Sequence, residues 1–404
     1  MIEIAEAIKI VNRETSALTS ESVDLDGAVG RILAENIVAD ADLPPFDRSQ
    51  MDGFAVIAAD TRNTPVTLKI VGESAAGRGW HDKIKSGQAV RIMTGAPVPA
   101  GADAVQKIEL TRSPGVAAGG THETVDILES VKKGSSIVRC GAEIKKGSTV
   151  FLKGEIVTPN MIAAIASFGY AKTKVGRQPR VSILSTGSEI VDVAAKPGRD
   201  QIRNSNSSML RVLAEKCGAV AESFPIASDD LSNLKVQIVS ASKNKDILII
   251  TGGVSVGKYD LTKLALTELG AEIFFEKVRL KPGKPTVFGR LNKTLVFGLP
   301  GNPVSAAVTF YLFVRSAIVR MQGATATELR SGFAIVGSDV KAARDRDSYL
   351  PSTLATDRRG YLIAVPLKWQ GSSDFIGFAR AEALIFVAAD KLIVKGEPAK
   401  ILFL

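Results

Sequence analysis

The sequence is short of the residues from which many catalytic and metal centres are built. Its 404 residues include two cysteines and two histidines. Two histidines exclude a histidine-rich metal site, and two isolated thiols in so long a chain are typical of a reducing cytoplasm. Aromatic residues make up only 6% of the chain, which argues against a nucleic-acid surface built on stacked rings.

Targeting patterns are also missing. The N-terminal stretch MIEIAEAIKIVNRETS lacks the basic-then-apolar order of a signal peptide, and its apolar spacing predicts a short amphipathic helix. We expect no apolar run long enough to span a membrane. These absences predict a soluble, cytoplasmic protein without a membrane partner.

The overall composition is that of a globular protein. Hydrophobic residues make up 45% and charged residues 23% of the chain, and the length predicts two to four domains. The formal net charge is +9, from 51 basic and 42 acidic residues. This excess favours an anionic ligand or partner without choosing among phosphate, nucleic acid and membrane.

Residues 172–323 alternate strand-like and helix-like patterns, which predicts a mostly parallel sheet covered by helices. In such sheets ligands bind beyond the carboxyl ends of the strands. The loops STGSE (185–189) and TGGVSVG (251–257) are expected there. The predicted strands are 180–187, 220–228 and 246–253, and the predicted helices are capped by Asn206, Ser207 or Ser208, by Asp229 or Asp230, and by Asp260.

The flanking regions have β character. Residues 41–140 are rich in Gly, Val, Ala and Pro, and 324–404 contain short strand-like pieces such as GYLIAVPLK and EALIFVAA. The predicted domains are an α/β domain (1–20 with 171–323), a β-rich domain (41–140), a linking domain (21–40 with 141–170) and a C-terminal β-barrel (324–404).

Two loops of the α/β region are suited to an anion. In the first, Gly252 and Gly253 let the chain turn sharply and bring bare N–H groups near a ligand, with Ser255 in the same loop. A tight turn with Asp260 as a helix cap explains that loop equally well. The second, GLPGNPVS (298–305), is a rigid loop at a helix start, for which an ordinary strand-to-helix connection is the alternative. Its candidate residues are Pro300, Gly301, Asn302 and Pro303.

The stretch EKVRLKPGKP (276–285) concentrates positive charge. Lys277, Arg279 and Lys281 alternate, so an extended strand would place them on one face, and Lys284 follows a Pro-Gly turn. Like charges on one face repel unless an anion lies among them or water solvates them. The pattern favours anion binding, and a solvated edge strand is the alternative.

Three carboxylates, Glu189, Asp229 and Asp260, fall at presumed carboxyl ends of strands. Magnesium commonly binds a few carboxylates together with substrate phosphate, so the set predicts a Mg²⁺ site. Helix capping would explain each residue taken alone. In PPFDRSQMDGFAV (44–56), Asp52 precedes a glycine, as it would in a simple turn.

Six motifs occur in one order over residues 44–305: PPFDRSQMDGFAV, RIMTGAPVP, STGSEI, TGGVSVGKYD, KPGKP and GLPGNPVS. Together they resemble the molybdopterin molybdenumtransferase family, the MoeA proteins and the E domain of gephyrin. The resemblance implies a multidomain α/β and β fold with a MogA-like sheet domain, and an elongated protomer. It also implies a homodimer whose active site lies between the α/β domain of one subunit and the β-rich domain of the other.

The resemblance further implies a transferase reaction. Molybdate would be inserted into adenylyl-molybdopterin, with Mg²⁺-dependent release of AMP. Homodimerisation and transient contact with other cofactor-biosynthesis proteins are expected, and nucleic-acid binding is not. The alternatives are a molybdopterin adenylyltransferase and a non-enzymatic molybdopterin-binding scaffold.

The family resemblance and the chemistry of the loops together give the candidate site residues. The catalytic candidates are Asp52, Glu189, Asp229, Asp260, Lys277 and Lys281, and the metal ligands among them are Glu189, Asp229 and Asp260. The substrate-binding candidates are Thr94, Glu143, Thr186, Gly187, Gly252, Gly253, Ser255, Lys284, Pro300, Gly301, Asn302, Pro303 and Ser372.

One departure from the family pattern lies in the last domain. Pro351 stands where many members have an arginine, and Arg344 and Arg346 are near enough in sequence to replace it.

Overall fold

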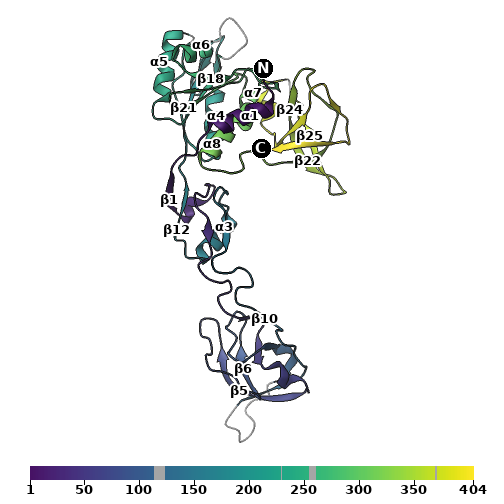
Figure 1. Ribbon diagram of the computed structural model, residues 1–404. Coiled ribbons are helices and arrows are strands. Elements are labelled where there is room, and N and C mark those ends of the chain that lie inside the picture. The colour runs from purple at the N-terminus through teal and green to yellow at the C-terminus, as the bar shows by residue number, and fades with distance from the viewer. Residues whose placement is uncertain (113–122, 229, 254–260, 369–370) are drawn as a thin grey trace. The chain divides into compact units, whose positions relative to one another are not determined.

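The chain divides into two compact units. The computed structural model describes residues 1–112, 123–228, 230–253, 261–368 and 371–404 (Figure 1). The division into four domains stays a prediction. The larger unit comprises Met1–Glu35, Lys153–Ala163 and Ala171–Leu404, and the smaller unit comprises Asn36–Leu152 and Ala164–Tyr170.

A six-stranded sheet in the order β16-β13-β17-β21-β20-β18 forms the centre of the larger unit. The first four strands are parallel, β20 runs antiparallel to β21, and β18 runs antiparallel to β20. Every residue of β17 is buried, because apolar cores cover both faces of the sheet. The strands are β13 (Arg180–Ser185), β16 (Val220–Ser223), β17 (Ile247–Thr251), β18 (Glu272–Phe275), β20 (Val287–Leu291) and β21 (Thr294–Leu299).

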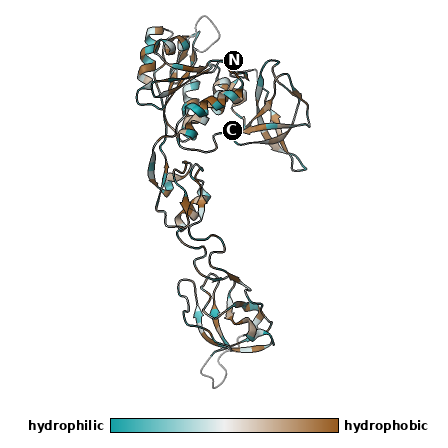
Figure 2. Ribbon diagram, viewed as in Figure 1, coloured by the Kyte–Doolittle hydropathy of each residue, from teal (hydrophilic) through white to brown (hydrophobic). Residues whose placement is uncertain are grey.

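Helices flank this sheet, with α5 and α6 on one apolar core and α1, α4 and α7 on the other (Figure 1). Helices α1, α4, α5 and α6 carry both hydrophobic and hydrophilic residues, as Figure 2 shows, because only one side of each helix is buried, whereas α7 is buried almost all round. The helices are α1 (Ile4–Glu14), α4 (Ser205–Lys216), α5 (Leu231–Ser242), α6 (Leu261–Glu268), α7 (Pro303–Thr309), the π-helical turn η3 (Phe310–Val314) and α8 (Arg315–Met321).

The predicted helix caps are partly right. Asp230 caps α5, because its carboxylate accepts a hydrogen bond from the N–H of Asn233 at 2.7 Å. The cap of α4 is Asn204, which accepts from the N–H of Ser207 at 3.1 Å, and not one of the three residues predicted from 206 to 208. Asn206 is unavailable as a cap because its side chain points into the protein and donates to the Thr251 hydroxyl.

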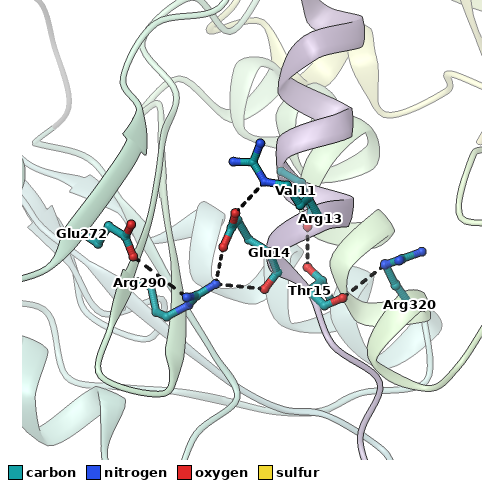
Figure 3. A network of polar contacts seen from close by, with 7 residues as sticks. All are labelled: Val11, Arg13, Glu14, Thr15, Glu272, Arg290 and Arg320. Atoms are coloured by element: carbon teal, nitrogen blue, oxygen red, sulfur yellow. Dashed lines mark hydrogen bonds and ion pairs between the residues drawn. The ribbon is translucent and has the colours of Figure 1, made fainter.

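The N-terminal helix is fastened to the sheet by polar contacts at its C-terminal end (Figure 3). Glu14 accepts hydrogen bonds from Arg13 at 2.8 Å and from Arg290 of β20 at 2.5 Å. Thr15 donates to the carbonyl of Val11. The hydrogen bond from Arg13, together with Arg290, lowers the pKa of the Glu14 carboxyl, so this contact persists well below neutral pH.

The longest apolar helical stretch is Pro303–Met321, which runs through α7, η3 and α8. It is long and apolar enough to cross a membrane, so the expectation that no run would reach this length was wrong. Because 83% of its apolar window is buried inside the protein, it is a core helix of the kind found in soluble proteins.

The predicted C-terminal β-barrel is present. Strands β24, β25, β22, β28 and β26 pair in a closed ring, and β19 adds to β24 in parallel. Tyr349, Leu384 and Leu402 of the barrel share an apolar core with the α/β sheet. The strands are β19 (Leu280–Lys281), β22 (Ser331–Val336), β24 (Asp347–Thr356), β25 (Leu362–Pro366), β26 (Ala383–Val387) and β28 (Pro398–Phe403).

Short elements complete the larger unit. They include two-stranded pairs, β1 with β12, β14 with β15 and β23 with β27. Their bounds are β1 (Ser20–Asp24), α2 (Leu25–Ala28), β12 (Lys172–Gly176), β14 (Ile190–Val191), β15 (Ile202–Arg203), β23 (Val340–Lys341), α9 (Phe375–Phe378) and β27 (Leu392–Ile393). Helix α3 (Pro159–Ser167) contributes residues to both units.

The smaller unit is built on a sheet in the order β7-β4-β6-β5-β9-β8, as its β-rich composition predicts. Apolar cores lie on both faces, with Phe54 and Val56 in one and Ala55 and Val90 in the other. The elements are β2 (Ile37–Val38), β3 (Arg48–Ser49), β4 (Gly53–Val56), η1 (Ala58–Thr61), β5 (Val66–Ser74), β6 (Gln88–Ile92), β7 (Ala104–Lys107), η2 (Ile108–Leu110), β8 (Thr111–Arg112), β9 (Thr124–Ile127), β10 (Ile137–Val138) and β11 (Thr149–Phe151).

A pair of phenylalanines tests where the stability of the larger unit resides. Phe297 of β21 is 0% exposed and packs on Phe288 with ring centroids 4.7 Å apart, whereas Phe333 of β22 is 74% exposed. We expect Phe297→Ala to lower the free energy of unfolding by about 3–5 kcal/mol because it leaves a cavity. Phe333→Ala should change it by less than about 0.5 kcal/mol. Denaturant unfolding measures both, and equal losses would contradict this assignment of the core.

Candidate functional site

A cavity of about 880 Å³ opens at the carboxyl ends of β13 and β17, beside the start of α7. This is the rim at which the parallel sheet predicts ligand binding. The cavity brings together eight of the predicted site residues. They are Thr186, Glu189, Gly252, Gly253, Pro300, Gly301, Asn302 and Pro303.

Glycine is required where β17 ends against its neighbour. Gly252 has a φ of +94°, and a Cβ atom there would lie 2.4 Å from the carbonyl oxygen of Thr186. The strands are also tied together at this point, because the N–H of Thr186 donates to the carbonyl of Thr251. The sharp turn predicted at these glycines is therefore present, and the approach of its N–H groups to a ligand stays a prediction.

Glu189 places a carboxylate at the edge of this cavity. A Cβ atom on Gly187 would lie 2.6 Å from its Oε2 atom, so the glycine leaves room for the carboxylate. Within the described parts of the chain, no Lys or Arg forms an ion pair with Glu189. A carboxylate that lines a cavity without a cationic partner has the chemistry of a metal ligand.

The other two predicted metal ligands, Asp229 and Asp260, lie outside the described residues, as does Ser255. Across the residues that are described, no group of three His, Cys, Asp or Glu side chains could hold a metal ion. The three-carboxylate Mg²⁺ site therefore stays a prediction, supported in the described structure by Glu189.

A second cavity, of about 540 Å³, adjoins the first. Both are lined by Pro285, Pro300 and Asn302. Its described lining contains no Asp or Glu but four basic side chains, two from residues 281–284 and two from residues 341–346. The basic lining residues are Lys281, Lys284, Lys341 and Arg346, and the cavity that they line is called the basic cavity.

A loop of the C-terminal barrel region closes one side of both cavities. The side-chain amide of Asn302 donates to the hydroxyl of Ser372 at 2.8 Å, and the N–H of Val304 donates to the Ser372 carbonyl. Asn302 begins α7 as predicted, but its side chain makes no cap hydrogen bond because it is engaged with Ser372. Ser372, predicted from the family resemblance, therefore contacts the GLPGNPVS loop through Asn302.

The expectation of one lysine face over 277–281 was wrong. Strand β18 ends at Phe275 and only Leu280–Lys281 is strand, since β19 pairs with β24 of the barrel. Lys281 lines the basic cavity, whereas Arg279 forms an ion pair with Glu3 at 2.9 Å. Lys277 lines neither cavity, and its carbonyl accepts from the N–H of Ile2.

One polar residue of the site, Asn206, was not predicted as a ligand contact. Asn206 lines the larger cavity, and its amide donates to the Thr251 hydroxyl and to the carbonyl of Gly301. The signal was the run of polar residues 204–208 after a predicted strand, which was assigned only to capping. Arg346 was named as a replacement for the arginine missing at Pro351, and it does line the basic cavity.

In the smaller unit, Asp52 and Thr94 are in direct contact, and Glu143 pairs with Arg48 at 3.1 Å. The Asp52 carboxylate accepts hydrogen bonds from the N–H of Thr94 at 2.7 Å and from its hydroxyl at 2.9 Å. These two bonds lower the pKa of Asp52, so it is ionised at neutral pH. The turn predicted at Asp52 thus carries a charged, oriented carboxylate.

Comparison with known proteins identifies the family. The chain is 36% identical over 390 residues to the molybdopterin molybdenumtransferase of Bacillus subtilis, covering 96% of this chain and 90% of that protein. The chain belongs to the molybdopterin molybdenumtransferase (MoeA) family. The protein of the same name from Haemophilus influenzae is 34% identical over 376 residues, covering 92% of this chain and 90% of that one.

Three family regions match in the expected order. The MoeA N-terminal region (domain I and II) matches residues 2–169, the probable molybdopterin binding domain matches 182–320, and the MoeA C-terminal region (domain IV) matches 334–404. A crystal structure of the molybdopterin biosynthesis MoeA protein of Pyrococcus horikoshii OT3 superposes with a TM-score of 0.85 at 30% identity, covering 100% of both chains. The predicted family and fold class are confirmed.

Removing the Thr94 hydroxyl tests how Asp52 is held. In Thr94→Val the carboxylate keeps the backbone N–H but loses the hydroxyl donor, so we expect the pKa of Asp52 to rise toward its ordinary value. Thr94→Ser keeps the hydroxyl and should leave the pKa low. An NMR titration of the side-chain carboxyl carbon measures both. An unchanged pKa in the valine variant would show that the hydroxyl does not stabilise the charge.

Proposed function

We propose that this protein inserts molybdate into adenylyl-molybdopterin and releases AMP. The observation that carries the proposal is the pair of adjoining cavities. The larger cavity can hold an organic substrate, and the Glu189 carboxylate is among its lining groups. The smaller cavity has four basic side chains in its lining. The relatives named molybdopterin molybdenumtransferase support the same reaction class.

The basic cavity suits molybdate, a small oxyanion with two negative charges. Lys281, Lys284 and Lys341 supply ammonium donors, and Arg346 adds a guanidinium that also contacts Asp345 at 3.1 Å. Charge-assisted hydrogen bonds from such groups to oxygen are stronger than neutral ones. The cavity therefore offers an oxyanion both charge neutralisation and several donors.

The larger cavity suits the organic substrate. Its volume of about 880 Å³ falls within the range of small-molecule sites. The glycine turn at Gly252 brings backbone groups close to a ligand, and the 19-residue helical run that begins at Pro303 points its positive end at the same rim. Both features favour the negatively charged part of an adenylylated substrate.

The reaction needs no nucleophilic side chain under this proposal. The lysines of the basic cavity hold molybdate next to the substrate, and their charges offset the repulsion between the two anions. Asn206 and Asn302, fixed by their own hydrogen bonds, restrict the orientation of the substrate at the rim. Asp52, held ionised by Thr94, is a further candidate that the same assay can examine.

Magnesium is proposed as the metal of this site. Glu189 would hold it, together with Asp229 and Asp260, because carboxylate oxygens are the ligands this ion prefers. When bound, Mg²⁺ supplies charge that polarises the phosphoanhydride of the adenylylated substrate. Glu189 itself keeps its carboxylate in the cavity, where Gly187 leaves the space for it.

A homodimer, cytoplasmic location and transient contact with other cofactor-biosynthesis proteins are further proposals. They rest on the family resemblance and on the scarcity of cysteine, and sedimentation velocity would test the dimer. An adenylyltransferase is not favoured, because the chain also matches the MoeA N-terminal and C-terminal regions. A scaffold without activity is not favoured either, because the basic side chains remain around the cavity.

The direct test is to incubate the purified protein with adenylyl-molybdopterin, molybdate and Mg²⁺ and to follow AMP and molybdenum-loaded cofactor. Both products should appear, and only when molybdate is present. Release of AMP without metal incorporation would contradict the proposal.

Lys281→Ala tests the basic cavity. Loss of one charge-assisted donor should weaken molybdate binding by roughly tenfold with little effect on the unfolding free energy, because the side chain is exposed. Lys400→Ala, an equally charged change at an exposed position on β28, is the matched control and should leave binding unchanged. Calorimetric titration with molybdate distinguishes them, and equal affinities would remove Lys281 from the site.

Glu189→Gln tests the metal role. The change keeps the size of the side chain and removes its charge, so we expect Mg²⁺-dependent turnover to fall by roughly 100-fold while thermal unfolding is unchanged. Glu215→Gln, on the exposed side of α4, is the control. Normal turnover of the Glu189 variant at limiting Mg²⁺ would exclude this carboxylate as a ligand.

A further inference from the structure

A third cavity, of about 740 Å³, lies at the opposite rim of the α/β sheet, where β13, β17 and β21 begin. Five basic side chains and one carboxylate are among its lining residues. They are Arg177, Arg180, Lys243, Lys245, Lys293 and Asp246.

Two tight turns form the walls of this cavity. Asn244 and Asn292 both adopt positive φ, of 58° and 54°, and each has lysine beside it in the sequence. The hydroxyl of Thr294 joins the turns, because it lies 3.1 Å from the carbonyl of Ser242 and 2.9 Å from that of Lys245. The turns are thus held at a fixed distance by a buried side chain.

The carboxylate in this cavity is already fully engaged. Arg177 donates to both oxygens of Asp246, at 2.8 and 3.1 Å, and the N–H of Arg180 donates to it at 2.7 Å. Lys245 pairs with Glu222 of β16. These contacts account for two of the five basic side chains.

The remaining three, Arg180, Lys243 and Lys293, are exposed, and no carboxylate of the described residues lies within ion-pair distance of them. The carbonyl groups at the C-terminal end of α5 do not need these three cations as hydrogen-bond donors. The last carbonyls of that helix already accept hydrogen bonds from the Ser242 hydroxyl, the Lys243 N–H and other polar groups. The cavity therefore has an excess of donors and of positive charge.

We propose that this cavity is a second anion site, which binds a small ligand carrying two or more phosphate charges. Three cations around a cavity of this volume favour an anion with more than one charged group, and guanidinium and ammonium donors both match phosphate oxygens. The side-chain amides of Asn244 and Asn292 add neutral donors at the rim.

This site is separate from the transferase site. Strand β17 joins the two rims, with Asp246 immediately before it and Gly252 immediately after it. Five residues of extended chain span about 17 Å. One small ligand cannot occupy both rims, so the second site is distinct from the proposed transferase site.

Calorimetric titration of the whole protein with inorganic pyrophosphate at low ionic strength tests this proposal. Two classes of binding are expected, one in the basic cavity and one here. The double substitution Lys243→Gln/Lys293→Gln should weaken the second class by about tenfold or more without changing the unfolding temperature, because both lysines are exposed. The same variant should keep full molybdenum-insertion activity.

Two comparisons make the result decisive. Lys281→Ala should weaken only the first class, and Lys391→Gln/Lys400→Gln, which removes the same charge elsewhere, should weaken neither. Equal pyrophosphate binding by the parent and the Lys243→Gln/Lys293→Gln variant would overturn the proposal. Tighter binding of mixed-sequence duplex DNA than of pyrophosphate, lost in the same variant, would also overturn it and would assign the surface to nucleic acid.

Discussion

The α/β part of this protein depends on the complete burial of its parallel strands. All five residues of β17 are buried, and the side chains of the first four, Ile247 to Ile250, enter apolar cores on alternate faces. Because neither face can hold an unpaired polar group without a cost in free energy, charged chemistry is confined to the two rims. The cavities lie at these rims. The larger transferase cavity lies beyond the carboxyl ends of the strands, and the proposed second anion site lies before their amino ends.

The same burial brings neighbouring strand ends close together. Gly252 sits against the carbonyl of Thr186 with no room for a side chain, and Gly187 leaves space for the Glu189 carboxylate. A loop built in this way offers backbone groups and one carboxylate to a ligand, and its shape depends little on side-chain rotamers. This arrangement suits a site that must hold anionic substrates in a fixed orientation.

The elements of the α/β sheet were predictable because their signals are local. Apolar runs ended at glycine, and Asp230 preceded its helix, so strand and helix positions followed from spacing. The lysine face was not predictable, because β24 recruits Leu280–Lys281 into its own sheet from 66 or more residues away in the sequence. The ion pair of neighbouring Arg279 was not predictable for a similar reason, since its partner Glu3 lies near the N-terminus, far away in the sequence.

The side-chain roles at the site followed the same division. Glu189 and the GLPGNPVS loop lie at the larger cavity, and the binding roles that their motifs predict stay predictions, whereas the capping role given to Asn206 was wrong because its amide donates to Thr251 and Gly301. The contact of Asn302 with Ser372 could be suspected only through the family resemblance, since 70 residues separate the two.

The core that the barrel shares with the α/β sheet has a consequence for any attempt to shorten this chain. Tyr349, Leu384 and Leu402 pack into the same cluster as the sheet residues, and β19 forms its strand pairing with β24. A fragment ending before β22 would expose apolar surface to water and leave an unpaired strand edge, which invites self-association. The barrel therefore shields apolar surface of the α/β domain from water, and the two domains are best expressed together in one chain.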